Sequence, residues 1–359
     1  MMKLNLIVPL NCMSYGYVGC FIYEELKKLI DVKARCIRGF SAEERFHYIA
    51  EDASKFNYEF HHDAPSLKIW HQFDLNDFTG RGPKIGFPIF ELDRFTDLEK
   101  HNLSYPDHLL VCSEWAKSII LKEIDRKEET VHVVPLGVDR ETFKDALSID
   151  SGTTKFVNYG KWELRKGHDV IIEAFSRAFT EDDDVKLFMS CENVFLKQYQ
   201  HDEWLQFYKN SELASKVEFI KRQEDQLGVY NTMKDMDCGV FPARAEGWNL
   251  ELLEMMSCGK HVIATNITGH TEFCNSDNCM LIDLENMETA FDGQFFNGQG
   301  DWYSIEDKHI DQLAEYMKNV HKLKQENKLG QNEEGIKTAK EFTWTKSAEK
   351  IVKVLEEIL

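Results

Sequence analysis

Residues 241–254 decide the fold prediction and have the sequence Phe241-Pro242-Ala243-Arg244-Ala245-Glu246-Gly247-Trp248-Asn249-Leu250-Glu251-Leu252-Leu253-Glu254. The pattern predicts a strand that ends at Phe241, a loop, and a helix that begins near Trp248. If Glu246 and Glu254 both lay on a helix, the 1.5 Å rise per residue would separate them by about 12 Å along its axis. That distance is too large for two carboxyl groups acting on one bond. It suits two contacts to an extended ligand.

The start of this predicted helix is the second part of the pattern. Free backbone N–H groups at a helix N-terminus attract anions, and Gly247 allows a close approach. A nucleotide sugar matches this layout, because a diphosphate lies between a ribose and a sugar. In the alternative interpretation Glu246 caps the helix and Glu254 lies on its solvated face. Glu254 borders the apolar face, however, where a carboxylate needs a partner.

A second segment, residues 159–169, contains three cations in a loop between a strand and a helix: Lys161, Arg165 and Lys166. Cations at the carboxyl end of a strand are well placed to neutralise a leaving diphosphate. The alternative is that Arg165 and Lys166 are solvated loop charges.

The rest of the chain alternates short apolar runs with helical patterns, which is typical of parallel α/β proteins. We expect two doubly wound Rossmann-like domains, with a ligand site in the cleft between them. The predicted strands are 4–9, 67–70, 84–87, 108–112, 131–137, 156–159, 185–189, 217–220, 238–241 and 261–265. The predicted boundaries are an N-terminal domain over 1–147, a linker over 148–154, a C-terminal domain over 155–340 and a final amphipathic helix within 341–359.

Composition limits the function classes. Lys and Arg total 43 against 62 Asp and Glu, so the formal charge is −19, which opposes tight binding to nucleic acid without excluding a local basic groove. No run reaches the roughly 20 apolar residues of a membrane helix. The nine cysteines lack zinc-finger spacing, so we expect reduced thiols in a cytoplasmic protein.

The two segments together resemble glycosyltransferase family 4, a group of retaining enzymes with the GT-B fold (glycosyl transferases group 1). The paired-glutamate motif of the family is similar to Glu246 through Glu254, followed by residues 255–265. The family's loop that ends in Lys-Gly is similar to residues 160–167, and Val134-Pro135-Leu136-Gly137 looks like the end of its first domain. The resemblance covers nearly all of residues 155–285 and is looser over 1–150. It implies that the last helix packs back on the first domain.

The resemblance implies a role for each matching residue. Glu246 would contact the hydroxyls of the donor sugar and Glu254 the ribose. Lys161 and Lys166 would hold the diphosphate. The remaining donor contacts would come from Gly160, Arg165, Gly247, Trp248, Asn249 and Leu250. Two positions depart from the family: Lys161 replaces an Arg and loses bidentate geometry, and Asn249 replaces a frequent Gly, so that its amide shifts or its side chain reaches the donor.

The first half contains weaker candidates. His71 follows a strand, where the family often has a histidine that contacts the donor, and a hydrogen-bonded polar residue at a strand end is the alternative. Glu91 is similar to an acid found after the next strand in several members. We expect a loop at residues 14–19, in which Tyr15, Gly16 and Gly19 approach a phosphate or shape an acceptor site.

The expected reaction is transfer of a sugar from a UDP- or GDP-linked donor to a hydroxyl acceptor such as a glycan or a lipid-linked sugar, with retention of configuration. No cofactor or metal is expected: Asp235 and Asp237 resemble a metal-binding aspartate pair but precede a buried strand, and cations with a helix dipole can replace the metal. Two alternatives stay open, a phage-type DNA-base glycosyltransferase and a nucleotide-sugar-binding protein without activity. A pyridine-nucleotide oxidoreductase is disfavoured because no Gly-x-Gly-x-x-Gly follows the first strand.

Overall fold

The computed structural model describes residues 1–147 and 152–359, which form two compact units. Unit 1 comprises Met1–Gly137 and Glu341–Leu359, and unit 2 comprises Val138–Lys340. Four residues of the predicted linker, 148–151, lie outside the described residues, and its last residue, Thr154, already begins a strand. The predicted domain boundaries stay a prediction.

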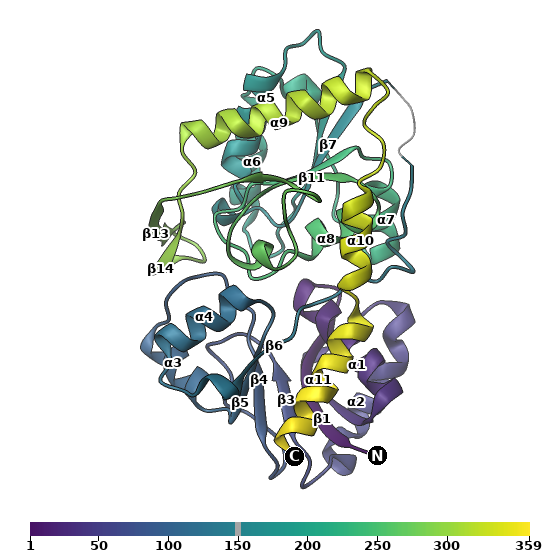
Figure 1. The fold of residues 1–359 in the computed structure, drawn as a ribbon, viewed down its shortest axis with the longest axis vertical. Helices are drawn as coiled ribbons and strands as arrows, with labels where there is room; N and C mark the ends of the chain where they lie inside the picture. Colours follow the sequence, from purple (N-terminus) through teal and green to yellow (C-terminus); the bar gives the residue numbers. More distant parts are fainter. Residues whose placement is uncertain (148–151) are drawn as a thin grey trace. The chain divides into compact units, whose positions relative to one another are not determined.

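Unit 1 contains a six-stranded parallel sheet in the order β2-β1-β3-β4-β5-β6 (Figure 1). Its strands are β1 (Lys3–Asn11), β2 (Asp31–Ser41), β3 (Ser66–Ile69), β4 (Lys84–Phe87), β5 (His108–Val111) and β6 (Val131–Val133). Residues 4–10 of β1 are buried on both faces, as expected for a central strand of a parallel sheet. The order reverses at β1, because the chain adds β2 on one side of this strand and β3 on the other.

Helices connect these strands: α1 (Ser14–Leu29), α2 (His47–Glu59), α3 (Asp97–Ser104) and α4 (Glu114–Glu123), with short turns η1 (Glu44–Phe46) and η2 (Glu128–Thr130). The last helix, α11 (Trp344–Ile358), lies beside α1 within unit 1 (Figure 1). The Trp344 ring stacks on Phe21 of α1, with centroids 5.2 Å apart. Ser347 donates a hydrogen bond to the Pro135 carbonyl at 2.7 Å. The predicted return of the last helix to the first domain is thereby confirmed.

The predicted loop at residues 14–19 is wrong, because Gly16 and Gly19 lie inside α1. A Cβ on Gly16 would overlap the carbonyl oxygen of Asn11, and a Cβ on Gly19 would overlap that of Pro9. Because both glycines lack a Cβ, α1 can pack closely against the end of β1.

Unit 2 contains the second six-stranded parallel sheet, in the order β12-β11-β10-β7-β8-β9. The strands are β7 (Thr154–Tyr159), β8 (Val185–Ser190), β9 (Val217–Phe219), β10 (Cys238–Phe241), β11 (His261–Thr265) and β12 (Met280–Ile282). Two six-stranded parallel sheets in two such units confirm the predicted doubly wound fold. The strand order reverses between β7 and β10, which makes the carboxyl ends of these two strands the expected ligand position.

The helices of unit 2 are α5 (His168–Ala178), α6 (Gln198–Lys209), α7 (Gln226–Met233), α8 (Leu250–Ser257), α9 (Asp307–Gln325) and α10 (Glu333–Glu341). Three short turns, η3 (Leu164–Lys166), η4 (Ala214–Lys216) and η5 (Thr268–Glu272), complete the connections. Apolar side chains of α5 and α9 share one core cluster with β7 and β8, and Figure 1 shows these two helices together over the sheet.

An antiparallel hairpin of β13 (Met287–Phe291) and β14 (Asn297–Tyr303) follows β12 and was not predicted. Phe296 packs against Trp302 with ring centroids 5.4 Å apart. The Tyr303 N–H donates to the Arg244 carbonyl at 3.0 Å. The hairpin is therefore attached to the loop after β10.

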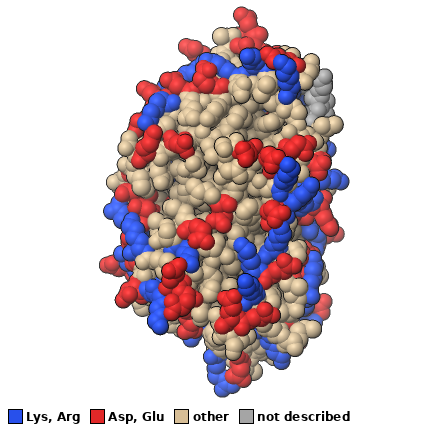
Figure 2. Space-filling view, viewed as in Figure 1, with Lys and Arg blue, Asp and Glu red and all other residues tan. Residues whose placement is uncertain are grey.

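Charged side chains of both signs are interspersed on the face shown in Figure 2, with no broad basic area on that face. None of the helices within residues 1–147 and 152–359 is long and apolar enough to cross a membrane.

Candidate functional site

The predicted site residues of unit 2 gather where its strand order reverses. Gly160 and Lys161 directly follow β7, and Glu246 follows β10 in the loop before α8. Residues 164–166 form the turn η3, and Gly167 is the N-cap of α5 with φ 73°. A Cβ on Gly167 would overlap the Pro242 carbonyl, so this glycine allows the loops after β7 and β10 to touch. Two segments about 80 residues apart in the sequence thus form one cluster.

Glu246 is the centre of this cluster. Its Oε1 lies 2.7 Å from Lys166 Nζ, and its Oε2 lies 2.9 Å from Arg165 Nη1. All three side chains are at most 10% exposed. Burial by itself raises the pKa of Glu246, but Arg165 and Lys166 outweigh it and hold that pKa well below its usual range. Glu246 is therefore an ionised carboxylate that accepts hydrogen bonds.

Lys166 is a charged ammonium group because the carboxylates near it outweigh the effect of its burial. Burial lowers the pKa of this amine, while Glu246 and then Glu251 raise it, and the net pKa lies above the ordinary value. Gly160 leaves room for this side chain, because a Cβ there would lie 2.9 Å from Lys166 Cδ.

Arg165 has protein partners that explain its burial. Its Nε and Nη2 donate to Glu163 Oε2 at 3.1 and 2.8 Å, and its Nη1 donates to the Ala245 carbonyl at 2.6 Å. These contacts fix the guanidinium between the two loops. The alternative of a solvated loop charge is wrong for Arg165 and Lys166, which are both buried. Lys161 differs, since its side chain is 43% exposed.

Asn249 directly precedes α8 and lies in the left-handed region, with φ 82°. Its Oδ1 accepts from the Leu252 N–H at 3.2 Å, so Asn249, and not Glu246, is the N-cap. Its Nδ2 lies 3.0 Å from His270 Nε2, while His270 Nδ1 lies 2.8 Å from the Thr265 carbonyl. A carbonyl only accepts, so Nδ1 carries the proton and Nε2 accepts from Asn249. The side chain of Asn249 is thus held inside the protein.

Glu254 lies on α8 and is 8% exposed, so it is not on a solvated face. Burial raises its pKa well above the ordinary value, and Glu251 and Asp139 raise it further. The two glutamates of the motif therefore differ chemically. Glu246 is held as an anion, while the environment of Glu254 favours a neutral carboxyl that both donates and accepts hydrogen bonds.

The other predicted contacts surround the start of α8. Leu250 is its first residue, and the buried Trp248 packs on Phe273 with ring centroids 4.9 Å apart. Gly247 lies between Glu246 and Trp248. The backbone N–H groups of this segment and of the first turn of α8 supply the N-terminal end of the helix dipole.

Unit 1 has a cluster of its own, at the carboxyl ends of β1, β3 and β4. The Tyr15 hydroxyl donates to the Ile89 carbonyl at 2.7 Å and accepts from the Ile89 N–H at 3.1 Å. The Tyr15 ring lies 4.6 Å from the His71 ring, centroid to centroid. Burial raises the Tyr15 pKa well above its ordinary value, and the charge of Glu91 raises it further. The structure thus brings together Tyr15, His71 and Glu91, but not Gly16 and Gly19 as a loop.

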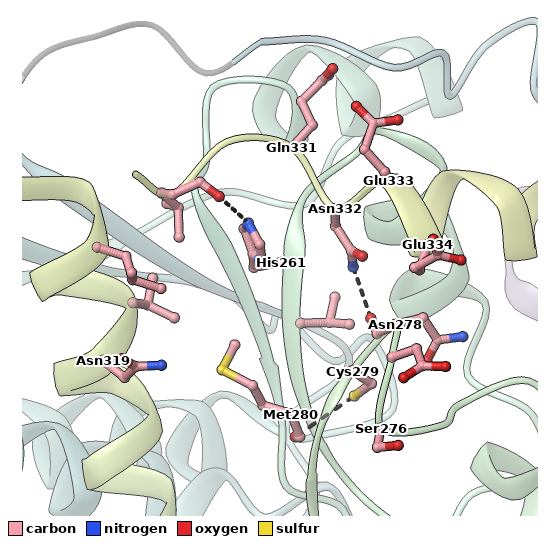
Figure 3. Close-up of a pocket in the computed structure, with 15 residues that line it drawn as sticks. His261, Ser276, Asn278, Cys279, Met280, Asn319, Gln331, Asn332, Glu333 and Glu334 are labelled. Carbon is pink, nitrogen blue, oxygen red and sulfur yellow. Dashed lines mark hydrogen bonds between the residues drawn. The ribbon is translucent and has the colours of Figure 1, made fainter. Parts of the chain in front are cut away.

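A separate pocket of about 380 Å³ lies in unit 2 (Figure 3). Its walls include His261 and Met280, the first residues of β11 and β12. It therefore lies at the amino ends of the strands, away from the position where parallel α/β sheets bind ligands. Across residues 1–147 and 152–359, no group of three or more His, Cys, Asp and Glu side chains could hold a metal ion. Asp237 instead pairs with Lys324 at 2.5 Å.

The sequence interpretation missed several residues that hold this cluster. Glu163 pairs with Arg165, and Asp169 pairs with Arg244 at 2.7 Å. Thr268 and His270 contact the loop after β10 from η5. Glu163 and Asp169 could have been found from the sequence, because they are charged residues next to a predicted site. Thr268 and His270 could not, because they lie more than 20 residues after the loop that they contact.

Comparison with known proteins agrees with this geometry. Residues 153–293 match the family model for glycosyl transferases group 1, which confirms the resemblance to that group and supports a nucleotide-sugar glycosyltransferase. No curated protein matches the sequence significantly.

Solved structures match over nearly the whole chain. A glycosyltransferase from Rickettsia africae is 15% identical with a TM-score of 0.68, and 99% of this chain and 98% of that chain are covered. Sucrose-phosphate synthase from Thermosynechococcus elongatus is 13% identical, with a TM-score of 0.69 and 99% of each chain covered. Anabaena HepE in complex with UDP-glucose is 13% identical, with a TM-score of 0.69, and 99% of this chain and 100% of that chain are covered. The chain therefore has the GT-B glycosyltransferase fold, and its residues 153–293 carry the domain of the glycosyl transferases group 1.

Proposed function

We propose that this protein is a retaining glycosyltransferase of family 4 that moves a sugar from a nucleotide-diphosphate donor to a hydroxyl acceptor. One observation carries the proposal: the buried triad of Glu246, Lys166 and Arg165 lies between the carboxyl ends of β7 and β10, next to the N-terminus of α8. An ionised carboxylate that accepts hydrogen bonds, two cations and a helix N-terminus meet there within one loop cluster.

Each part of a nucleotide sugar has a matching group. The ionised Glu246 accepts hydrogen bonds from sugar hydroxyls. Lys161, Lys166 and the N–H groups at the start of α8 bind the diphosphate. Glu254, with its raised pKa, exchanges hydrogen bonds with the two ribose hydroxyls. UDP- and GDP-linked sugars share these features, and HepE binds UDP-glucose.

The proposed chemistry relies on the leaving diphosphate. Lys161, Lys166 and the dipole of α8 stabilise the negative charge that develops as the bond to the sugar breaks. These groups also support transfer without a metal ion. A phosphate oxygen then takes the proton of the acceptor hydroxyl, which attacks on the same face that the nucleotide leaves. Glu246 is occupied by two cations and remains a hydrogen-bond acceptor rather than a proton donor.

The acceptor side of the proposal rests on unit 1, where Tyr15 and Glu91 belong to the second polar cluster, and His71 of the same cluster is proposed to contact the donor. The formal charge of −19 opposes a nucleic-acid acceptor, so we propose a hydroxyl of a glycan or a lipid-linked sugar. None of the nine cysteines, which all lie in described segments, forms a disulfide, and this supports a reducing compartment such as the cytoplasm.

The test is a panel of UDP- and GDP-linked sugars, with nucleotide release followed by mass spectrometry. The wild-type protein is expected to turn over one donor slowly with water and faster with an acceptor. Glu246→Ala and Lys166→Ala are expected to lose this activity. Glu218→Gln, which changes an exposed carboxylate paired with Lys186 on the outer strands of the sheet, is the matched control.

The proton NMR spectrum of the product gives the anomeric configuration, and an unchanged configuration is expected. Near wild-type rates in both Glu246→Ala and Lys166→Ala would overturn the site assignment. Donor binding without turnover, with every acceptor tried, would favour a binding protein.

A further inference from the structure

The turn η5 carries a strained residue beside the glutamate of the site. Thr268 has φ 43°, in the left-handed region, which β-branched side chains avoid because of steric crowding. It is only 4% exposed. Glycine adopts this conformation freely, so a threonine here is a less stable choice. Such strain persists only where the surroundings enforce it, and strained residues cluster at active sites and ligand contacts.

Thr268 and its neighbour hold the backbone of Glu246 from two sides. The Glu246 N–H donates to Thr268 Oγ1 at 2.9 Å. The Gly269 N–H donates to the Glu246 carbonyl at 2.9 Å. Gly269 must lack a side chain, because a Cβ there would overlap the Gly247 carbonyl. Both peptide groups of Glu246 are therefore fixed by η5.

The carboxylate of the same residue is fixed separately by Lys166 and Arg165. The η5 contacts complete this arrangement, because side-chain ion pairs alone leave the backbone of a loop residue free to shift. A displacement of about 1 Å at a reacting group is enough to lower a rate by about 100-fold.

We propose that Thr268 is a positioning residue, which uses its hydroxyl to hold Glu246 in the place where it contacts the donor sugar. This inference rests on the proposed function, in which Glu246 binds sugar hydroxyls. The hydroxyl is what glycine cannot supply, and this explains why a strained threonine stands at this position. Thr268 acts through Glu246.

Three substitutions separate the hydroxyl from the strain. Thr268→Val keeps the branched shape and the strain but removes the acceptor. Thr268→Ser keeps the acceptor with less crowding. Thr268→Gly removes both the acceptor and the strain. The matched control is Thr154→Val, because Thr154 is another buried threonine, whose hydroxyl bonds His321 at the opposite end of β7.

The measurements are kcat and KM with UDP-glucose and GDP-mannose as donors, the affinities for UDP and UDP-glucose by calorimetry, and the melting temperature. Thr268→Val and Thr268→Gly are expected to lower kcat about 10- to 100-fold, with donor KM changed less than about 3-fold because the diphosphate and ribose contacts remain. Thr268→Ser is expected to keep nearly full activity. Thr268→Gly is expected to melt no lower than Thr268→Val, despite its low kcat.

The outcomes are distinguishable. Unchanged kcat in Thr268→Val, or full activity in Thr268→Gly, would overturn the inference and leave the proposed function intact. A fall in kcat that follows the melting temperature across all four variants, including Thr154→Val, would show a structural role only. A wild-type protein that neither binds nor turns over any donor would overturn the proposed function, and the inference with it.

Discussion

Lys166 Nζ lies 2.7 Å from Glu246 Oε1, and this contact joins two loops that are 80 residues apart in the sequence. Both groups are buried, and the same lysine is proposed to bind the diphosphate of the donor. A donor would therefore add a second anion beside a cation that already has one, with Lys161 as the exposed additional positive charge.

The first prediction concerns this ion pair. Lys166→Met leaves the buried Glu246 with Arg165 as its main cation, so we expect it to destabilise the protein by about 1.5–3 kcal/mol, as for the loss of one hydrogen bond to a charged group. The double variant Lys166→Met/Glu246→Leu removes both charges and is expected to recover much of that loss, although it stays inactive. Urea unfolding of the two variants measures the difference. Equal stability losses in the single and double variants would contradict this account.

The second prediction concerns acid stability. The folded pKa of Glu246 is lowered, so its ion pairs contribute stability that is present above the unfolded pKa, near 4.5, and is lost as the pH falls toward the folded value. We expect the wild-type protein to lose stability between about pH 5 and pH 2 more steeply than Glu246→Gln. Thermal melting at a series of pH values tests this. If the melting temperatures of the wild-type protein and Glu246→Gln fell equally with pH, this prediction would be contradicted.

Glu254 is expected to behave in the opposite way. Its folded pKa is raised by burial, so its ionisation opposes folding above the unfolded pKa, near 4.5, and the penalty grows until the pH passes the folded pKa. Glu254→Gln is therefore expected to raise the melting temperature at pH 8 but not at pH 4. The same variant is expected to keep UDP binding within about 3-fold of wild type, since the glutamine amide, like a neutral carboxyl, both donates and accepts hydrogen bonds. A less stable variant at pH 8 would contradict the assignment.

Asn249 combines a left-handed backbone with a helix cap. Asn249→Ala is expected to cost about 1–2 kcal/mol, because alanine loses the cap and avoids this φ. Asn249→Gly is expected to cost less, since glycine adopts φ 82° without strain. The free energies of unfolding of the two variants give the comparison. Equal losses would mean that the contact with His270, absent in both, dominates.

A substitution at Gly16 tests whether the first turn of α1 serves packing on β1 rather than phosphate binding. Gly16→Ala is expected to destabilise unit 1, because the new Cβ would overlap the Asn11 backbone. Its UDP affinity should stay within about 2-fold of wild type, since unit 2 carries the proposed diphosphate contacts. Calorimetric titration with UDP, together with thermal melting, separates the two effects. A large loss of UDP affinity at unchanged stability would restore a phosphate-binding role.

The sequence was most informative where a pattern is local. The apolar runs of the central strands, such as residues 4–9 and 238–241, predicted both sheets. The segments 159–169 and 241–254 predicted that Lys166, Glu246 and the helix after residue 248 belong to one site. Strand β2 was missed because Asp31–Ser41 is half exposed at the edge of its sheet and has no continuous apolar run. The hairpin β13–β14 was missed for the same reason.

Other features depend on contacts between distant residues, which no local pattern shows. Gly16 and Gly19 suggest a loop by residue type, and only the close packing of α1 on β1 shows why they lie in a helix. The partners of Arg165, and the hydrogen bond from Glu246 to Thr268, follow from how two loops and η5 meet in space.

The position of α11 has a consequence for how the protein is made. Unit 1 begins at the first residue, yet its last helix follows all of unit 2, and Trp344 supplies the ring that stacks on Phe21. At about 5–20 residues per second, a ribosome needs about 10–40 s to synthesise the intervening residues of unit 2. During that interval Phe21 lacks the Trp344 ring, although its contact with the Phe46 ring can already form. Unit 1 therefore reaches its final packing only after the whole of unit 2 has been synthesised.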